Sequence, residues 1–141
     1  MISHWISSAL EATGVQAEVL GTADTQRTVA RLNERLGVDV TRPAAWDDEA
    51  APDGRFRTDG WELIPSYVGT AGCLLFGAGA QMIWRFTSGP DLLQVLRECP
   101  ALEFYVCDPE ADYLLCSNHH DVVIGWGAAS GWVDNLSNLN L

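Results

Sequence analysis

Residues 116–121, CSNHHD, place a thiol, an amide, two imidazoles and a carboxylate within six positions of an otherwise apolar segment. A cysteine with two histidines could bind zinc, and a Cys–His–Asp set contains the residue types of a nucleophilic site. The segment could also be a turn between two strands, because asparagine and aspartate side chains accept hydrogen bonds from neighbouring backbone N–H groups.

The spacing of these residues favours the turn. Structural zinc sites pair two separated ligand loops, and catalytic partners usually converge from different elements. We therefore expect no metal, no cofactor and no catalytic residue. A structural role is assigned to Asn118, His119, His120 and Asp121. The alternative is a small metal-binding or hydrolytic enzyme centred on Cys116, His119, His120 and Asp121.

Charge is the strongest compositional feature of the 141-residue chain. The chain has nineteen acidic side chains and eight basic ones, all arginine, which gives a formal net charge of −11. Such a field repels phosphate backbones and attracts cationic surfaces, so we expect a basic protein partner and no binding of nucleic acid. No apolar run approaches the roughly 20 residues of a membrane span. The amino terminus lacks the features of a secretory signal, so we expect a cytoplasmic protein without membrane contact.

Length and composition indicate one domain over residues 1–141, with 48% hydrophobic and 19% charged residues. Apolar spacing in residues 1–38 predicts two helices that pack as a helical hairpin. The first spans residues 3–13. The second begins at a cap formed by Asp24 and ends at Gly37.

Residues 39–60 are polar and rich in prolines, Asp-Gly pairs and acids, which predicts a long loop. Loops of about 20 residues are uncommon in compact domains and are often functional. Trp46 and Phe56 are large apolar residues within this loop. They either anchor it to the core, which is the interpretation we favour, or offer contact surface to a partner.

Residues 61–141 predict the sheet core. A capping box at Asp59 starts a short helical turn, and Ser88 caps a helix that ends near residue 99. Strands are expected at residues 73–76, 81–86, 103–107, 113–116 and 122–126, and residues 127–141 could form a closing helix. The fold class is therefore α+β. Its antiparallel sheet has about five strands (a two-stranded hairpin, a helix, then a three-stranded meander), with helices packed mainly on one face.

The six tryptophans suggest how such a protein could bind a partner. Aromatic side chains anchor protein interfaces, and carboxylates around them favour a cationic partner. The expected partner-binding residues are Trp46, Asp47, Asp48, Glu49, Asp53, Asp108, Glu110, Asp112, Trp126 and Trp132.

Residues 61–127 resemble a family of small bacterial proteins in which an aromatic-rich strand leads into a C-x-N-H-H-D segment. The matching residues are Tyr113, Leu115, Cys116, Asn118, His119, His120 and Asp121. Small, acidic, lysine-poor α+β chains of this kind also resemble the immunity proteins of polymorphic toxin systems. That similarity of size and charge implies a protein that neutralises a cognate bacterial toxin by covering its active cleft with an acidic surface.

A nuclease or nucleic-acid deaminase is the favoured toxin, because such enzymes carry basic clefts that an acidic surface can occupy. An ADP-ribosylating or peptidase toxin is an alternative within the same class. A regulatory or scaffold domain without any toxin is an alternative of a different class.

Overall fold

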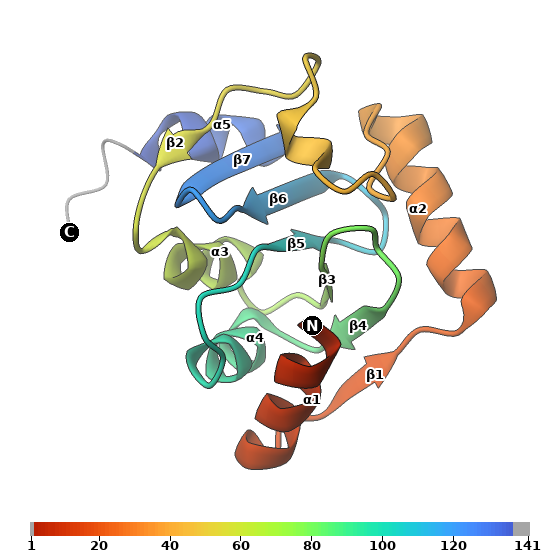
Figure 1. Ribbon diagram of the computed structural model, residues 1–141, viewed down its shortest axis with the longest axis vertical. Coiled ribbons are helices and arrows are strands. Elements are labelled where there is room, and N and C mark those ends of the chain that lie inside the picture. The colour runs from red at the N-terminus through yellow and green to blue at the C-terminus, as the bar shows by residue number, and fades with distance from the viewer. Residues whose placement is uncertain (1, 137–141) are drawn as a thin grey trace.

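Residues 2–136, the part of the chain that the computed structural model describes, form a seven-stranded antiparallel sheet (Figure 1). From one edge to the other its strands are β1 (Ala17–Val19), β4 (Ile83–Phe86), β3 (Cys73–Phe76), β5 (Phe104–Cys107), β6 (Tyr113–Ser117), β7 (Val122–Gly127) and β2 (Arg55–Phe56). The α+β class is confirmed, and so are the hairpin β3–β4 and the meander β5–β6–β7. The sheet has seven strands within these residues rather than about five, because the short edge strands β1 and β2 were not predicted.

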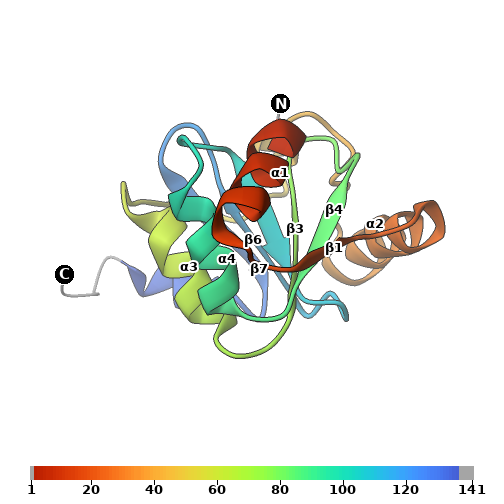
Figure 2. The same cartoon turned by 90° about the horizontal axis from the view of Figure 1, so that it is seen from below.

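Helices cover both faces of the sheet unequally (Figures 1 and 2). On the face that we call the helix face lie α1 (Ile2–Thr13), α3 (Gly60–Val68), α4 (Gly89–Arg97) and α5 (Ser130–Asp134). The opposite face carries α2 (Thr22–Leu36) and the segment 38–51, which includes the 3-10 turn η1 (Ala45–Asp47). Helices therefore do pack mainly on one face. The predicted closing helix is α5, and residues 137–141 lie outside the described residues.

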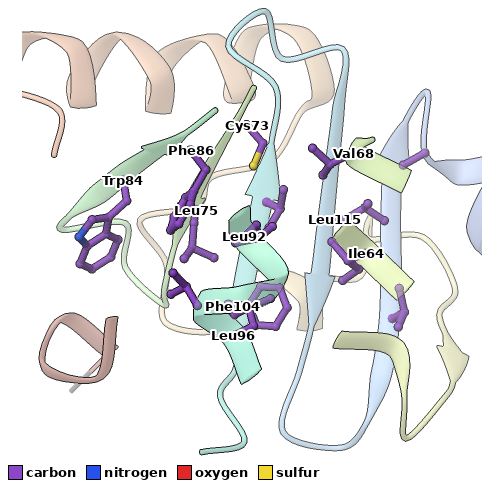
Figure 3. Close-up of a cluster of buried hydrophobic side chains, with 14 of the residues drawn as sticks. Ile64, Val68, Cys73, Leu75, Trp84, Phe86, Leu92, Leu96, Phe104 and Leu115 are labelled. Atoms are coloured by element: carbon purple, nitrogen blue, oxygen red, sulfur yellow. The ribbon is translucent and has the colours of Figure 1, made fainter. Parts of the chain in front are cut away.

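The central strands are buried on both sides. Every residue of β3 and of β5 is buried, because alternate side chains enter the two separate cores. Leu75 belongs to the core under the helix face, drawn in Figure 3, whereas Leu74 and Phe76 belong to the core under α2. Continuous apolar runs replace alternation in these strands for that reason.

The predicted helical hairpin over residues 1–38 is wrong. α1 and α2 pack on opposite faces of the sheet, and between them the chain forms β1, which pairs with β4. Asp24 does not cap α2, whose N-cap is Gly21; its carboxylate instead pairs with Arg27 in the first turns. Gly37 does end the helix, in the left-handed conformation at φ 69° that suits glycine.

The predicted loop at residues 39–60 contains two short elements, η1 and β2. The capping box at its end is absent, because the Asp59 carboxylate pairs with Arg57 at 2.9 Å and makes no cap bond. The cap at Ser88 is confirmed: its Oγ accepts the Asp91 backbone N–H at 3.3 Å. Within the described residues, no helix has the length and apolar content to cross a membrane.

Candidate functional site

The CSNHHD segment forms the end of β6 and the turn into β7, as the sequence predicts. Asp121 donates its backbone N–H to the Asn118 carbonyl at 3.1 Å and adopts a left-handed φ of 59°. Asn118 braces the turn from inside, because its Oδ1 accepts the backbone N–H groups of His120 at 2.9 Å and Val122 at 3.1 Å. The Asn118 side chain therefore fixes the position of both histidines.

Cys116 does not join the histidines. Its side chain enters the core under α2 and is fully buried, whereas His119 and Asp121 line a cleft that opens from the helix face. Burial raises the pKa of the Cys116 thiol well above its ordinary value, so the nucleophilic thiolate is disfavoured. Within residues 2–136, no three His, Cys, Asp or Glu side chains are grouped to hold a metal ion.

Glu103, just before β5, contacts the turn from the neighbouring strand. One of its carboxylate oxygens lies 2.8 Å from His119 Nδ1 and also accepts the His119 backbone N–H at 3.2 Å. In the neutral imidazole, this contact places the proton on Nδ1 and leaves Nε2 as an acceptor. The side chain of Glu103 is 17% exposed and that of His119 is 63% exposed, so the imidazole edge faces solvent.

The cleft beside this turn has a volume of about 350 Å³. Its polar wall comes from the turn and from β5 and β6: Glu103, Ser117, Asn118, His119 and Asp121. Its apolar wall comes from α3, α4 and the chain after α4: Trp61, Leu96, Leu102 and Phe104. A cleft of this size that combines an apolar wall with a few convergent polar groups has the general form of a ligand site.

On the opposite side of the same turn lies Trp46. Its ring centroid is 5.6 Å from that of His119 and 5.7 Å from that of His120, both in edge-on geometry. Trp46 is half-buried and packs on the core under α2, so it anchors the loop as predicted. Its indole Nε1 and the Tyr105 hydroxyl are buried without hydrogen-bond partners among residues 2–136. Burial, and after it the neighbouring Cys116, raises the pKa of the Tyr105 hydroxyl, so this group stays protonated.

Phe56 is not an anchor, which corrects the prediction. On β2, the flanking Arg55 and Arg57 reach α5 on the helix face, at Asp134 (3.7 Å) and at the Leu136 carbonyl (2.5 Å). Because neighbouring side chains on a strand point to opposite faces, Phe56 points to the side of Trp46. There it is 68% exposed, more than any other large apolar side chain in the described part of the chain.

The acids among the predicted partner-binding residues lie in two segments of the chain. Asp47, Asp48, Glu49 and Asp53 are exposed in the segment that precedes β2, and Asp48 pairs with Arg42 at 2.7 Å. The 108–112 turn connects the end of β5 to the start of β6, and it contains Asp108, Glu110 and Asp112. The predicted acids therefore belong to two separate segments of the chain, and both segments lie near the C-terminal end of α2, where Asp48 is close to Leu36 and Asp112 pairs with Arg35.

The other two tryptophans predicted to contact a partner differ in burial, and Trp126 alone is removed from the surface. Trp126 is 6% exposed and packs on the core under α2. Trp132 is half-buried against the helix-face core, with its ring centroid 5.1 Å from that of Tyr67. No feature of the sequence pointed to Trp61, Glu103 and Ser117, whereas the size of Phe56 in a polar loop indicates contact surface as the alternative to anchoring.

The eight arginines show which carboxylates are neutralised. Arg31 donates to the Pro109 carbonyl at 2.7 Å, and the other seven pair with one carboxylate each. Asp47, Glu49 and Asp53 have no arginine partner in the described part of the chain, and all three are exposed. The segment before β2 therefore presents a net negative charge beside the exposed Phe56.

Comparison with known proteins gives no relative from which a function could be inferred. The chain matches no model of a protein family, no curated protein and no solved structure. Any functional conclusion therefore depends on the arrangement and charge of the side chains themselves.

Proposed function

We propose that the protein is an immunity protein, which binds a cognate bacterial toxin and covers its active cleft. The contact surface is formed by Trp46, Asp47, Glu49, Asp53 and Phe56, and we call it the acidic–aromatic surface. The observation that carries the proposal is the 68% exposed Phe56, which follows, within the same segment of the chain, three exposed carboxylates that have no arginine partner among the described residues. Exposed apolar side chains rimmed by charge are typical of protein-binding surfaces.

The charge of this surface favours a basic partner. Asp47, Glu49 and Asp53 lie within seven positions of the sequence, and of the acids at positions 47–53 Asp48 alone has an arginine partner among the described residues. Clustered like charges steer an oppositely charged protein and raise its association rate. A nuclease or nucleic-acid deaminase toxin fits best, because a cleft that attracts phosphates also attracts these carboxylates.

The aromatic residues supply the affinity that charge does not. Phe56 is exposed in the free protein, so its burial in a partner's pocket removes apolar surface from water. Trp46 lies on the same side of the sheet and is held by the core and by the histidines of the 118–121 turn. A surface fixed in this way loses little conformational entropy on binding.

The first test asks whether a toxin is encoded beside the gene. Co-expression of the protein should restore growth of cells that produce this toxin, and the purified pair should form a 1:1 complex. In the triple variant Asp47→Asn, Glu49→Gln, Asp53→Asn, the association rate at low salt should fall about tenfold and depend less on salt. The matched control removes three exposed charges elsewhere: Glu11→Gln, Glu34→Gln, Glu110→Gln. Equal loss in both triple variants would reject this surface as the contact.

The second test concerns Phe56. Phe56→Ala should raise the dissociation rate of the complex about 30-fold, which corresponds to the roughly 2 kcal/mol of a strong interface anchor. The unfolding free energy of the free protein should change little, because the side chain is exposed. Val19→Ala on the other edge strand is the control, since Val19 is 53% exposed and far from the acids in the sheet order. An unchanged dissociation rate in Phe56→Ala contradicts the proposal.

A further inference from the structure

The cleft beside the 118–121 turn contains polar side chains that the fold leaves without partners. Ser117 is 7% exposed and Asn118 is 4% exposed. Asn118 makes its side-chain hydrogen bonds through Oδ1, and among residues 2–136 neither its side-chain amide N–H groups nor the Ser117 hydroxyl has a partner. Neither group is sealed from solvent, because the polar side-chain atoms that are fully buried without a partner among residues 2–136 are Trp46 Nε1 and the Tyr105 hydroxyl. The Ser117 hydroxyl and the Asn118 amide are therefore accessible from the cleft.

Both side chains face the cleft and not a sealed core. Two residues before Ser117, Leu115 lies in the core under the helix face, so strand alternation directs Ser117 to the same side. Ser117 and Asn118 line the cleft together with Phe104. The missing hydrogen-bond partners can therefore come from a molecule in the cleft.

The charge of the cleft defines which molecule fits. Glu103 and Asp121 both line it, and neither lysine nor arginine is present among its lining residues. Only one oxygen of Glu103 is used by His119 in the described structure. In a chain with a net charge of −11, this cleft repels anions and attracts cations.

The apolar wall adds a second requirement. Trp61, Leu102 and Phe104 form the side of the cleft away from the turn. Aromatic faces attract cations and pack against flat or aliphatic groups. A bare inorganic cation would leave this wall without a contact.

We propose that the cleft binds an organic cation in which a guanidinium, amidinium or primary ammonium group is attached to an apolar body. Glu103 and Asp121 receive the charged group, Ser117 and Asn118 bond to its polar atoms, and the body packs against Trp61 and Phe104. This site is independent of the proposed toxin binding, because no residue of the acidic–aromatic surface lines the cleft. The ligand is either a free compound or the arginine or lysine side chain of a protein.

A series of three probes of similar shape tests the charge requirement. Benzamidine, benzamide and benzoate share a ring and carry charges of about +1, 0 and −1 at neutral pH. In NMR titrations of the whole protein, benzamidine should shift the Ser117 and Asp121 amides and the Trp61 indole, with a Kd on the order of 1 mM for so small a ligand. Benzamide should bind at least about fivefold more weakly, and benzoate more weakly still. Equal binding of all three, or no shifts at the cleft, overturns the proposal.

Substitutions then assign the charge to named carboxylates. Asp121→Asn should leave the backbone of the turn undisturbed, because asparagine tolerates the left-handed conformation of this position. Asp121→Asn and Glu103→Gln should each lower benzamidine affinity about three- to tenfold and leave benzamide affinity unchanged. The control Glu49→Gln should change neither. A preference for benzamidine over benzamide that survives both cleft variants overturns the proposal.

The source of the cation is distinguished by two further probes, agmatine and the blocked peptide acetyl-Ala-Arg-Ala-amide. Tighter binding of agmatine indicates a free metabolite-like ligand, and tighter binding of the peptide indicates a protein side chain. Binding of neither probe, in a protein that also ignores benzamidine, rejects the site. The triple variant of the acidic–aromatic surface should bind benzamidine normally. A negative result for the toxin proposal can therefore be told apart from a negative result for the cation site.

Discussion

The meander β5–β6–β7 is closed at its two ends by turns of the same backbone design. In each, the fourth residue donates its N–H to the carbonyl of the first at 3.1 Å and has a left-handed φ: 56° at Ala111 and 59° at Asp121. In each, a side-chain oxygen of the first residue accepts two backbone N–H groups. Asp108 does so in one turn and Asn118 in the other.

The surroundings of the two turns differ. At the 108–112 turn, α2 supplies Arg31 to the Pro109 carbonyl and Arg35 to the Asp112 carboxylate at 2.8 Å. In the described structure the 118–121 turn is bonded to the backbone N–H of Arg57, at 2.8 Å from the Asp121 carbonyl, and to no arginine side chain. It has Trp46 on one side and the cleft on the other. The same scaffold is thus attached to a helix at one end and displays polar groups at the other. The proposed cation site lies at the 118–121 end.

The largest expected effect comes from removing the bracing side chain of each turn. Asn118→Ala should lower the unfolding free energy by about 2–3 kcal/mol, because two backbone N–H groups lose their acceptor at a site that is 4% exposed. Asp108→Ala should cost about 1–2 kcal/mol, because Asp108 is half-exposed and water can replace its carboxylate. Urea unfolding of both variants measures the difference.

Asn118→Asp is the control for this pair. It retains a side-chain oxygen in the same position and should recover part of the loss seen in Asn118→Ala. Equal costs for Asn118→Ala and Asp108→Ala would show that burial does not distinguish the two turns.

A smaller effect is expected at the left-handed positions. Asp121→Gly should raise the unfolding free energy by about 0.5–1 kcal/mol, because glycine adopts this conformation without steric cost and the exposed Asp121 loses no packing. Ala111→Gly should have almost no net effect. Glycine relieves the same steric cost there, but the variant also removes a 2% exposed methyl group from the core under α2, and the two contributions are about equal.

Asp121→Val tests the backbone explanation. A β-branched residue is disfavoured at positive φ, so this variant should lose about 1–2 kcal/mol. If valine is tolerated and glycine does not stabilise, the turn must adopt another conformation in solution.

The sequence predicted the meander well and the sheet edges poorly, for a physical reason. β5, β6 and β7 are apolar runs separated by turn residues, so composition alone marks them. β1 has three residues and β2 has two, and they form only because β4 and β7 offer unpaired backbone groups. Apolar periodicity likewise identified the buried side of α1 and of α2, but it could not show that the two helices cover opposite faces.

The candidate site shows the same limit. Asn118 and Asp121 were predicted as turn residues because their side chains favour such turns. Glu103 lies 16 positions before His119, and only the pairing of β5 with β6 brings them together. Ser117 looked like another polar residue of the turn, and its burial follows from the packing of α3 and α4 against the end of the sheet.

The smallest expected effect concerns the arginine contact at the 108–112 turn. Both side chains of the Arg35–Asp112 pair are 55% exposed, so a double-mutant cycle with Arg35→Ala and Asp112→Ala should give a coupling energy of about 0.5 kcal/mol or less, reduced further by salt. A coupling above about 1 kcal/mol would mean that α2 holds this turn firmly and that the two ends differ in stability. If the coupling is as weak as we expect, the two turns differ in exposure, charge and unpaired polar groups. The proposed cation site depends on these properties.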